Sequence, residues 1–145
     1  MDLESTIRLD EDHSAVKLLL AHEGGRLVKR GTDPTGLYWA LLQPSTPASA
    51  PFIARINWTV YPDRPPSILF ADQIGGQTGV VSAWPAAAGY RAPNDICKPF
   101  TAEGHAVHPE WKTGHHRWRN EGNPFLFVVE TLLDDINRVD GRRVA

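Results

Sequence analysis

Residues 52–60 read FIARINWTV, and this stretch decides the fold. Every second residue from Phe52 to Val60 is apolar, while the intervening positions include Arg55 and Asn57. Successive side chains of a β-strand point to opposite faces of the sheet. The alternation therefore predicts a strand over residues 52–60 with one face in the core.

The flanking segments extend this strand into a sheet. Residues 61–66, YPDRPP, contain three prolines that fix φ and lack a backbone N–H, so the strand ends there, and residues 67–70, SILF, predict the next strand. Upstream, residues 27–29 and 37–42 flank the turn sequence GTDPTG and predict two more strands, with a surface connection over residues 43–51. Because sequential strands are usually neighbours, we expect a four-stranded antiparallel meander.

One helix is predicted before the strands in the chain and one after the long segment that follows them. The first is capped by Asp10 or Asp12 and ends at the glycine pair 24–25. The second begins at Asn123, which is followed by a proline at the first helical position, and apolar residues then recur at helical spacing as far as Ile136. The tail from Asp140 onward is expected to fray. The sequence thus predicts an α+β fold over a single domain, residues 1–145.

A long segment without periodicity separates the last strand from the second helix. Between residues 71 and 123 there are several Gly and Pro residues, four histidines and five large aromatic residues, and no regular element of useful length is predicted. The aromatic residues are expected to anchor this loop on the sheet: Trp84, Tyr90, Phe100, Trp111 and Trp118. Irregular segments of this length are usually functional or disordered, and these anchors favour an ordered, functional loop.

Composition limits the classes of function. The formal charge of −2 and the lack of a basic stripe argue against a nucleic-acid partner, and no run of apolar residues is long enough to suggest a membrane segment or a secretion signal. A single cysteine excludes an internal disulfide framework and is typical of a reducing compartment, so we expect a cytoplasmic protein.

That cysteine, Cys97, lies within the long loop in the sequence ICKPF and is the candidate nucleophile. A thiol reacts as its thiolate, which needs partial exposure and electropositive or hydrogen-bonding neighbours. Lys98, His105 and His108 are the candidates for such neighbours. The alternative is that Cys97 is a buried cysteine that packs as a small apolar residue.

The order of these features resembles the ubiquitin-conjugating enzyme family over most of the chain. The resemblance rests on the proline-rich turn 61–66 and the following strand, on the pair Ile96-Cys97, on Trp111 after the cysteine, and on the helix that follows Asn123. The family usually carries a His-Pro-Asn triplet upstream of its cysteine, whereas residues 86–89 here read AAAG. Divergent bacterial members lack the triplet and often have histidine nearby, so the chain looks more like those members.

The resemblance implies a ubiquitin-conjugating-enzyme-like fold and a transferase. Cys97 would accept a ubiquitin-like protein as a thioester from an activating enzyme and pass it to an amine on a target protein, with no metal or organic cofactor. His105 or His108 would act as the base or lower the pKa of the thiol, and Asp95 would orient or deprotonate the incoming lysine. Asn94 would take the role of the triplet asparagine, or it is simply a turn residue. Resemblance to bacterial conjugation systems also suggests a role in antiviral defence.

Three other hypotheses remain open at this stage. A relative without chemistry would bind ubiquitin-like proteins or ligases through the same fold. Cys97 and the histidines of the loop offer ligand types that zinc accepts, although their spacing matches no structural zinc pattern. A cysteine hydrolase would need a Cys–His pair and an oxyanion donor.

Overall fold

The predicted alternation appears as the central strand β3 (Phe52–Asn57) of the computed structural model, which describes residues 1–145. β3 pairs antiparallel with β2 (Leu37–Leu42) and with β4 (Ser67–Ala71), and β1 (Arg26–Val28) pairs with β2 at the edge. The sheet order β1-β2-β3-β4 is the predicted four-stranded meander, which is therefore confirmed.

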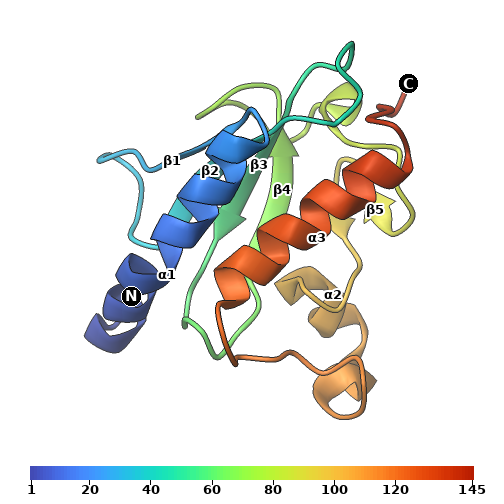
Figure 1. Ribbon diagram of the computed structural model, residues 1–145. Helices are drawn as coiled ribbons and strands as arrows, with labels where there is room; N and C mark the ends of the chain where they lie inside the picture. The colour runs from blue at the N-terminus through green and yellow to red at the C-terminus, as the bar shows by residue number, and fades with distance from the viewer.

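Two helices lie across one face of this sheet (Figure 1). α1 (Leu3–His22) precedes the sheet and α3 (Pro124–Arg138) follows the long loop, and the two helices pack against each other. No helix is long and apolar enough to cross a lipid bilayer. The α+β class with a helix at each end of the chain is thus confirmed.

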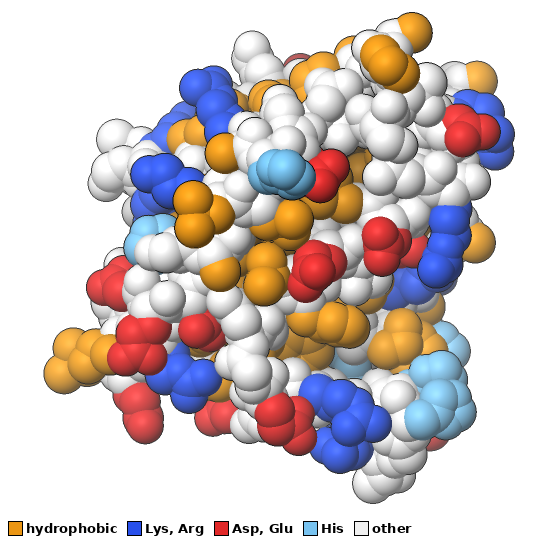
Figure 2. Space-filling model, viewed as in Figure 1, with side chains coloured by type: hydrophobic (Ala, Val, Ile, Leu, Met, Phe, Trp, Pro, Cys, Tyr) orange, Lys and Arg blue, Asp and Glu red, His pale blue; other side chains and the backbone are white.

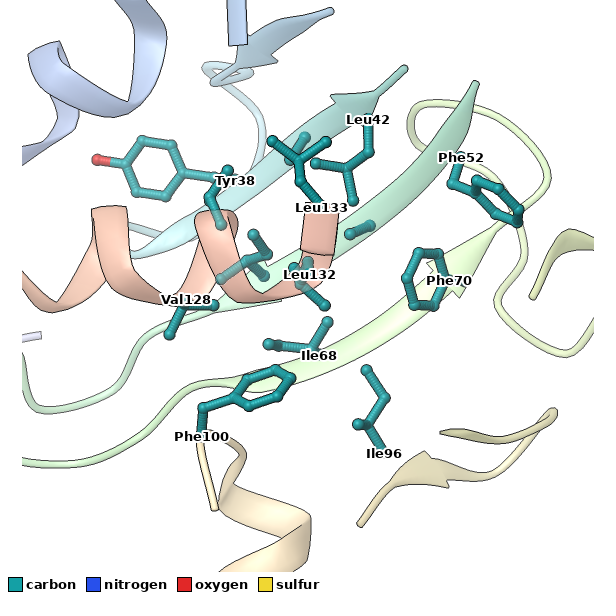
Figure 3. Packing of buried hydrophobic residues seen from close by; sticks show 14 of the residues in the cluster. Tyr38, Leu42, Phe52, Ile68, Phe70, Ile96, Phe100, Val128, Leu132 and Leu133 are labelled. Carbon is teal, nitrogen blue, oxygen red and sulfur yellow. The ribbon is translucent and has the colours of Figure 1, made fainter. Parts of the chain in front are cut away.

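The core fills the space between the sheet and the helices. Figure 3 shows Leu132 and Val128 of α3 pointing toward the sheet, where Ile68 and Phe70 rise from β4. Each of these side chains is fully buried, and burial of such a side chain contributes about 1.5–3 kcal/mol. Of the alternate residues expected in the core, Phe52, Ala54, Ile56 and Trp58 are buried, whereas Val60 is half-buried and lies beyond the end of β3.

α1 begins earlier than predicted, at Leu3 instead of near Asp10. Its cap is Asp2, whose Oδ1 accepts a hydrogen bond of 2.8 Å from the backbone N–H of Ser5. The predicted caps lie within the helix and do not interrupt it: Asp10 is exposed to solvent, whereas Asp12 is half-buried.

The proline-rich turn, residues 61–66, is hydrogen-bonded to both helices through Tyr61. The backbone N–H of Tyr61 donates to Ser5 Oγ of α1 at 3.0 Å, and the Tyr61 hydroxyl donates to Asp12. The same hydroxyl accepts a hydrogen bond of 3.3 Å from the backbone N–H of Phe125, at the start of α3. Trp58, placed in the predicted strand, lies one residue beyond β3 and packs its ring edge-on against Tyr61.

The C-terminal tail does not fray, contrary to the prediction. The backbone N–H of Val144 donates to Trp84 O at 3.0 Å, and the Arg143 guanidinium lies 3.9 Å from the ring centroid of Phe52. Arg143 Nη2 also donates to the carbonyls of Ala50 and Pro51 at 3.0 and 2.7 Å. A cation stacked on an aromatic ring with fixed carbonyl acceptors holds the tail in place, and such a contact leaves no periodic signal in the sequence.

The long loop contains short elements that the sequence did not predict. They are η1 (Val81–Ala83), β5 (Tyr90–Arg91), β6 (Asp95–Ile96), α2 (Ala102–Val107) and η2 (Pro109–Lys112). Three of the expected anchors, Trp84, Tyr90 and Phe100, are buried, whereas Trp111 and Trp118 are half-buried. The loop is therefore fixed on the sheet mainly by its first half.

Candidate active site

Cys97 lies directly after a short β-hairpin. In this hairpin Tyr90 pairs with Ile96 and Arg91 pairs with Asp95, and the backbone N–H of Cys97 donates to Gly89 O at 2.8 Å. The pairing therefore continues one residue beyond β6, with Gly89 opposite Cys97.

Alternation along the hairpin determines which side chains accompany Cys97. Tyr90 and Ile96 are buried in the core, and side chains at every second position share a face. The opposite face then carries Arg91, Asp95 and Cys97. Cys97 is a free, half-buried thiol on the outward face of the hairpin, which excludes the fully buried alternative.

The inward face anchors the hairpin. The Tyr90 hydroxyl donates to Asp135 Oδ2 of α3 at 2.7 Å, and both residues are buried. Burial, followed by the charge of Asp135 and this hydrogen bond, raises the pKa of Tyr90 far above its ordinary value, so the hydroxyl stays protonated. Asp135 lies near the C-terminal end of α3, where the helix dipole disfavours an acidic residue, and its hydrogen bond with Tyr90 explains its presence there.

The segment after Cys97 is fixed by α2. Thr101 Oγ1 donates to Ile96 O at 2.6 Å and accepts from the backbone N–H of Gly104 at 3.0 Å, so Thr101 is the N-cap of α2. Figure 3 shows Ile96 and Phe100 extending from this segment toward Ile68 of the sheet. Residues on both sides of Cys97 are therefore held against the core.

α2 is attached to the edge of the sheet by Glu103. Its Oε1 accepts hydrogen bonds of 3.2 Å from Ser67 Oγ and from the backbone N–H of Ile68. Burial raises the pKa of Glu103, an effect that these two hydrogen bonds only partly offset.

Gly89, opposite Cys97, makes room for the side chain of Lys98. Its φ of +83° lies in the left-handed region that favours glycine, and a Cβ atom there would lie 2.8 Å from Lys98 Cε and 3.2 Å from Cys97 O. The stem of Lys98 thus passes beside Gly89.

Asp95 is held by an ion pair across the hairpin. Arg91 Nε donates to Asp95 Oδ1 at 2.7 Å and Arg91 Nη2 donates to Oδ2 at 2.8 Å. This bond and the charge of Asp95 raise the pKa of Arg91, and a negative charge on Cys97 raises it further. Asn94 lies in the turn that connects the two strands, where its backbone N–H donates to Arg91 O at 2.8 Å.

Neither candidate histidine is bonded to Cys97. His105 Nε2 contacts Pro99 O at 2.7 Å, and His108 Nδ1 contacts Glu110 Oε1 at 2.8 Å. The His108 ring also stacks on Trp111, with ring centroids 4.1 Å apart. The two side chains organise the α2–η2 segment, and a Cys–His pair of the kind that a hydrolase requires is not formed.

The histidines of the loop do not form a metal site either. They gather around Trp111, which has His105, His108 and His116 as ring neighbours. No group of three or more His, Cys, Asp or Glu side chains is arranged so that it could hold a metal ion. The zinc hypothesis therefore has no ligand set in this structure.

A groove of about 800 Å³ is lined by residues 98–100, by residues of the segment 115–121 and by side chains of α3, including the exposed Phe127. Lys98, the residue after the cysteine, lines it, whereas Cys97 does not. Figure 2 shows Lys or Arg and His side chains gathered at the lower right of the molecule, over the segment that joins α2 to α3 in Figure 1.

Comparison with protein-family models, with curated proteins and with solved structures found no match to this chain. The site must therefore be interpreted from its geometry. Sequence reasoning missed Arg91, Thr101 and Gly89. Turn chemistry around residues 91–95 was the local signal for the hairpin that carries Arg91 and Gly89, and Thr101 is of a residue type that commonly caps a helix.

Proposed function

We propose that the protein is a conjugating enzyme that carries a ubiquitin-like protein as a thioester on Cys97. The acyl group comes from an activating enzyme and passes to an amine on a target protein. The observation that carries the proposal is the position of Cys97, a half-buried free thiol on the outward face of an anchored hairpin.

The chemistry needs a thiol that a large acyl donor can reach and that keeps its place during transfer. Cys97 meets both needs, because Tyr90, Ile96 and Thr101 fix the backbone while the thiol faces outward. The groove that Lys98 lines offers surface for the carried protein or for the target. The fold class and the order of the elements agree with the resemblance to ubiquitin-conjugating enzymes.

Two features distinguish this proposal from the alternatives. Metal chemistry and Cys–His hydrolysis lack the side-chain arrangements that they require. Asp95 lies on the face of Cys97 and is half-buried, and its carboxylate has acceptor sites beyond the two that Arg91 uses, so it can accept a hydrogen bond from an incoming lysine amine. A non-catalytic binding module would need neither an outward thiol nor a carboxylate beside it.

The test is intact-mass analysis after incubation with ATP, a ubiquitin-like protein and its activating enzyme. The wild-type protein should gain one ubiquitin-like protein in an adduct that a thiol reductant removes. Cys97→Ser should gain an adduct that resists the reductant, because an oxygen ester replaces the thioester, and Cys97→Ala should gain none. The same adduct on wild type and Cys97→Ala would exclude Cys97 as the carrier, and no adduct with a demonstrably active activating enzyme would favour a binding module.

A further inference from the structure

An arginine that the sequence analysis did not single out lies on the same face of the hairpin as Cys97. Arg91 lies directly across the hairpin from Asp95, and Cys97 is two residues beyond Asp95 on the same face. Cys97 and Arg91 are therefore diagonal neighbours, a relation that places Cα atoms about 7–8 Å apart in an antiparallel pair and within reach of long side chains. Gly89, opposite Cys97, has no side chain of its own, and the stem of Lys98 passes over it.

Arg91 retains hydrogen-bonding capacity. A guanidinium has five N–H donors, and the pair with Asp95 uses one on Nε and one on Nη2. The remaining donors are free of protein partners, and the side chain is 51% exposed. The bidentate pair fixes the plane of the guanidinium, so the free donors have a defined direction.

We propose that Arg91 stabilises negative charge at Cys97 and that Asp95 positions it for this role. In the free enzyme the charge is the thiolate of Cys97. In the acylated enzyme, which rests on the proposed function, the charge is the oxyanion formed when an amine attacks the thioester carbonyl carbon.

The acyl-transfer step balances with Arg91 protonated throughout. Attack forms the C–N bond and moves the C=O π pair onto oxygen, where Arg91 donates a hydrogen bond. Collapse restores the C=O bond, breaks the C–S bond and leaves the electron pair on sulfur, again beside Arg91. The nitrogen loses its extra proton to water.

Other charged groups surround the site and must be separated from Arg91 in any test. Asp95 opposes a thiolate, Lys98 favours it, and Glu103 lies close enough to Asp95 to feel its charge. His105 is bound to Pro99 O, two residues from the thiol. The pH profile of thiol reactivity in the wild type alone therefore cannot isolate the effect of Arg91. Two substitutions with opposite expected effects on that profile can.

The first experiment measures the alkylation rate of Cys97 by iodoacetamide, a neutral reagent, between pH 5 and 10 at low ionic strength. The interaction between Arg91 and a thiolate at the diagonal spacing is taken with a dielectric constant between that of water and that of a protein surface. Arg91→Gln should then lower the alkylation rate at pH 7 about three- to tenfold and move the pH profile to higher pH. Asp95→Asn should move it to lower pH. Arg26→Gln, the same charge change on the far edge strand, should leave it unchanged.

Opposite shifts exclude a general loosening of the fold, because loosening would expose the thiol in both variants. Coincident profiles for wild type and Arg91→Gln would overturn the proposal, as would shifts of equal sign. Arg91→Lys keeps the charge and loses the planar fork, so its alkylation profile should stay near that of the wild type.

The second experiment charges each variant with a ubiquitin-like protein, removes ATP and measures discharge to free lysine. Arg91→Gln and Arg91→Lys should both discharge at least about tenfold more slowly, since one oxyanion donor is often worth more than that. If the alkylation shifts appear but no thioester forms, the proposed function fails and the role of Arg91 toward the thiolate stands. If a thioester forms but the alkylation profiles and the discharge rates match the wild type, Arg91 is excluded and the proposed function stands.

Discussion

The bond between Tyr90 and Asp135 fixes the cysteine-bearing hairpin on α3, so Tyr90→Phe should destabilise the protein in a predictable way. The substitution removes one hydroxyl and leaves the ring in place. It leaves Asp135, which is only 8% exposed, without the donor 2.7 Å away, and the nearest cation, Arg138, is 3.8 Å from the carboxylate.

The magnitude follows from the cost of an unpaired buried carboxylate. Loss of a hydrogen bond to a charged group costs about 1.5–3 kcal/mol. For a chain of this size, each kcal/mol corresponds to a shift in Tm of roughly 2–4 °C, so the expected shift is about 3–12 °C. Asp135→Asn should cost less, because the amide oxygen still accepts from Tyr90 and no charge is buried.

Urea unfolding of the wild type, the two single variants and the double variant gives the coupling energy directly. Tyr90→Phe should cost less in the Asp135→Asn background than in the wild type.

The raised pKa of Tyr90 adds a pH signature: the wild type gains stability from the protonated hydroxyl below about pH 10 and loses it as the pH rises further. The difference between wild type and Tyr90→Phe should therefore shrink above pH 10. A cost below about 0.5 kcal/mol, or one that is equal in both backgrounds, would refute this reasoning.

Two further predictions concern the segment that follows Cys97. Thr101→Val removes the N-cap of α2 and a buried hydrogen bond to Ile96 O, so it should lower the free energy of unfolding in urea by about 1–2 kcal/mol. Thr101→Ser keeps the hydroxyl and should cost less than half as much. Equal losses would show that the hydroxyl is not what stabilises α2. Glu103→Gln keeps an oxygen that accepts from Ser67 and Ile68 while removing a charge whose pKa is raised by burial. A carboxyl whose pKa is raised in the folded state loses stability as it ionises, so the wild type should lose stability relative to Glu103→Gln as the pH rises from 4 to 7. Thermal unfolding measures this difference, and a difference that stays constant across the range would contradict the raised pKa of Glu103.

The sheet was predictable because its signal is local and periodic. The alternation from Phe52, the prolines after Tyr61 and the cap at Asn123 each restrict the backbone within a few residues, and the structure confirms the elements they predict. The start of α1 was not predictable, since several acidic residues can cap a helix and only tertiary packing decides how far it extends.

The surroundings of Cys97 depend on contacts that the sequence does not encode locally. The pairing of Tyr90 with Ile96 is too short to leave a periodic signal, and the partner of Tyr90 lies 45 residues away at Asp135. Nearness in sequence suggested the histidines as neighbours of the thiol. In the structure His105 on α2 contacts Pro99 O, while His108 contacts Glu110 and stacks on Trp111. The residue types of the site were visible in the sequence, whereas their pairing required the fold.

The most direct test of the central claim is a single-turnover chase. The protein is charged with a labelled ubiquitin-like protein, ATP is removed, and free lysine is added while intact mass is followed without reductant. If Cys97 is a carrier, its thioester should decay faster as lysine is added. The amide of lysine and the ubiquitin-like protein should appear in equal amount, and Cys97 should return as a free thiol. Release of the unmodified ubiquitin-like protein at a rate independent of lysine would contradict the account, because the protein would then hydrolyse the acyl group instead of transferring it.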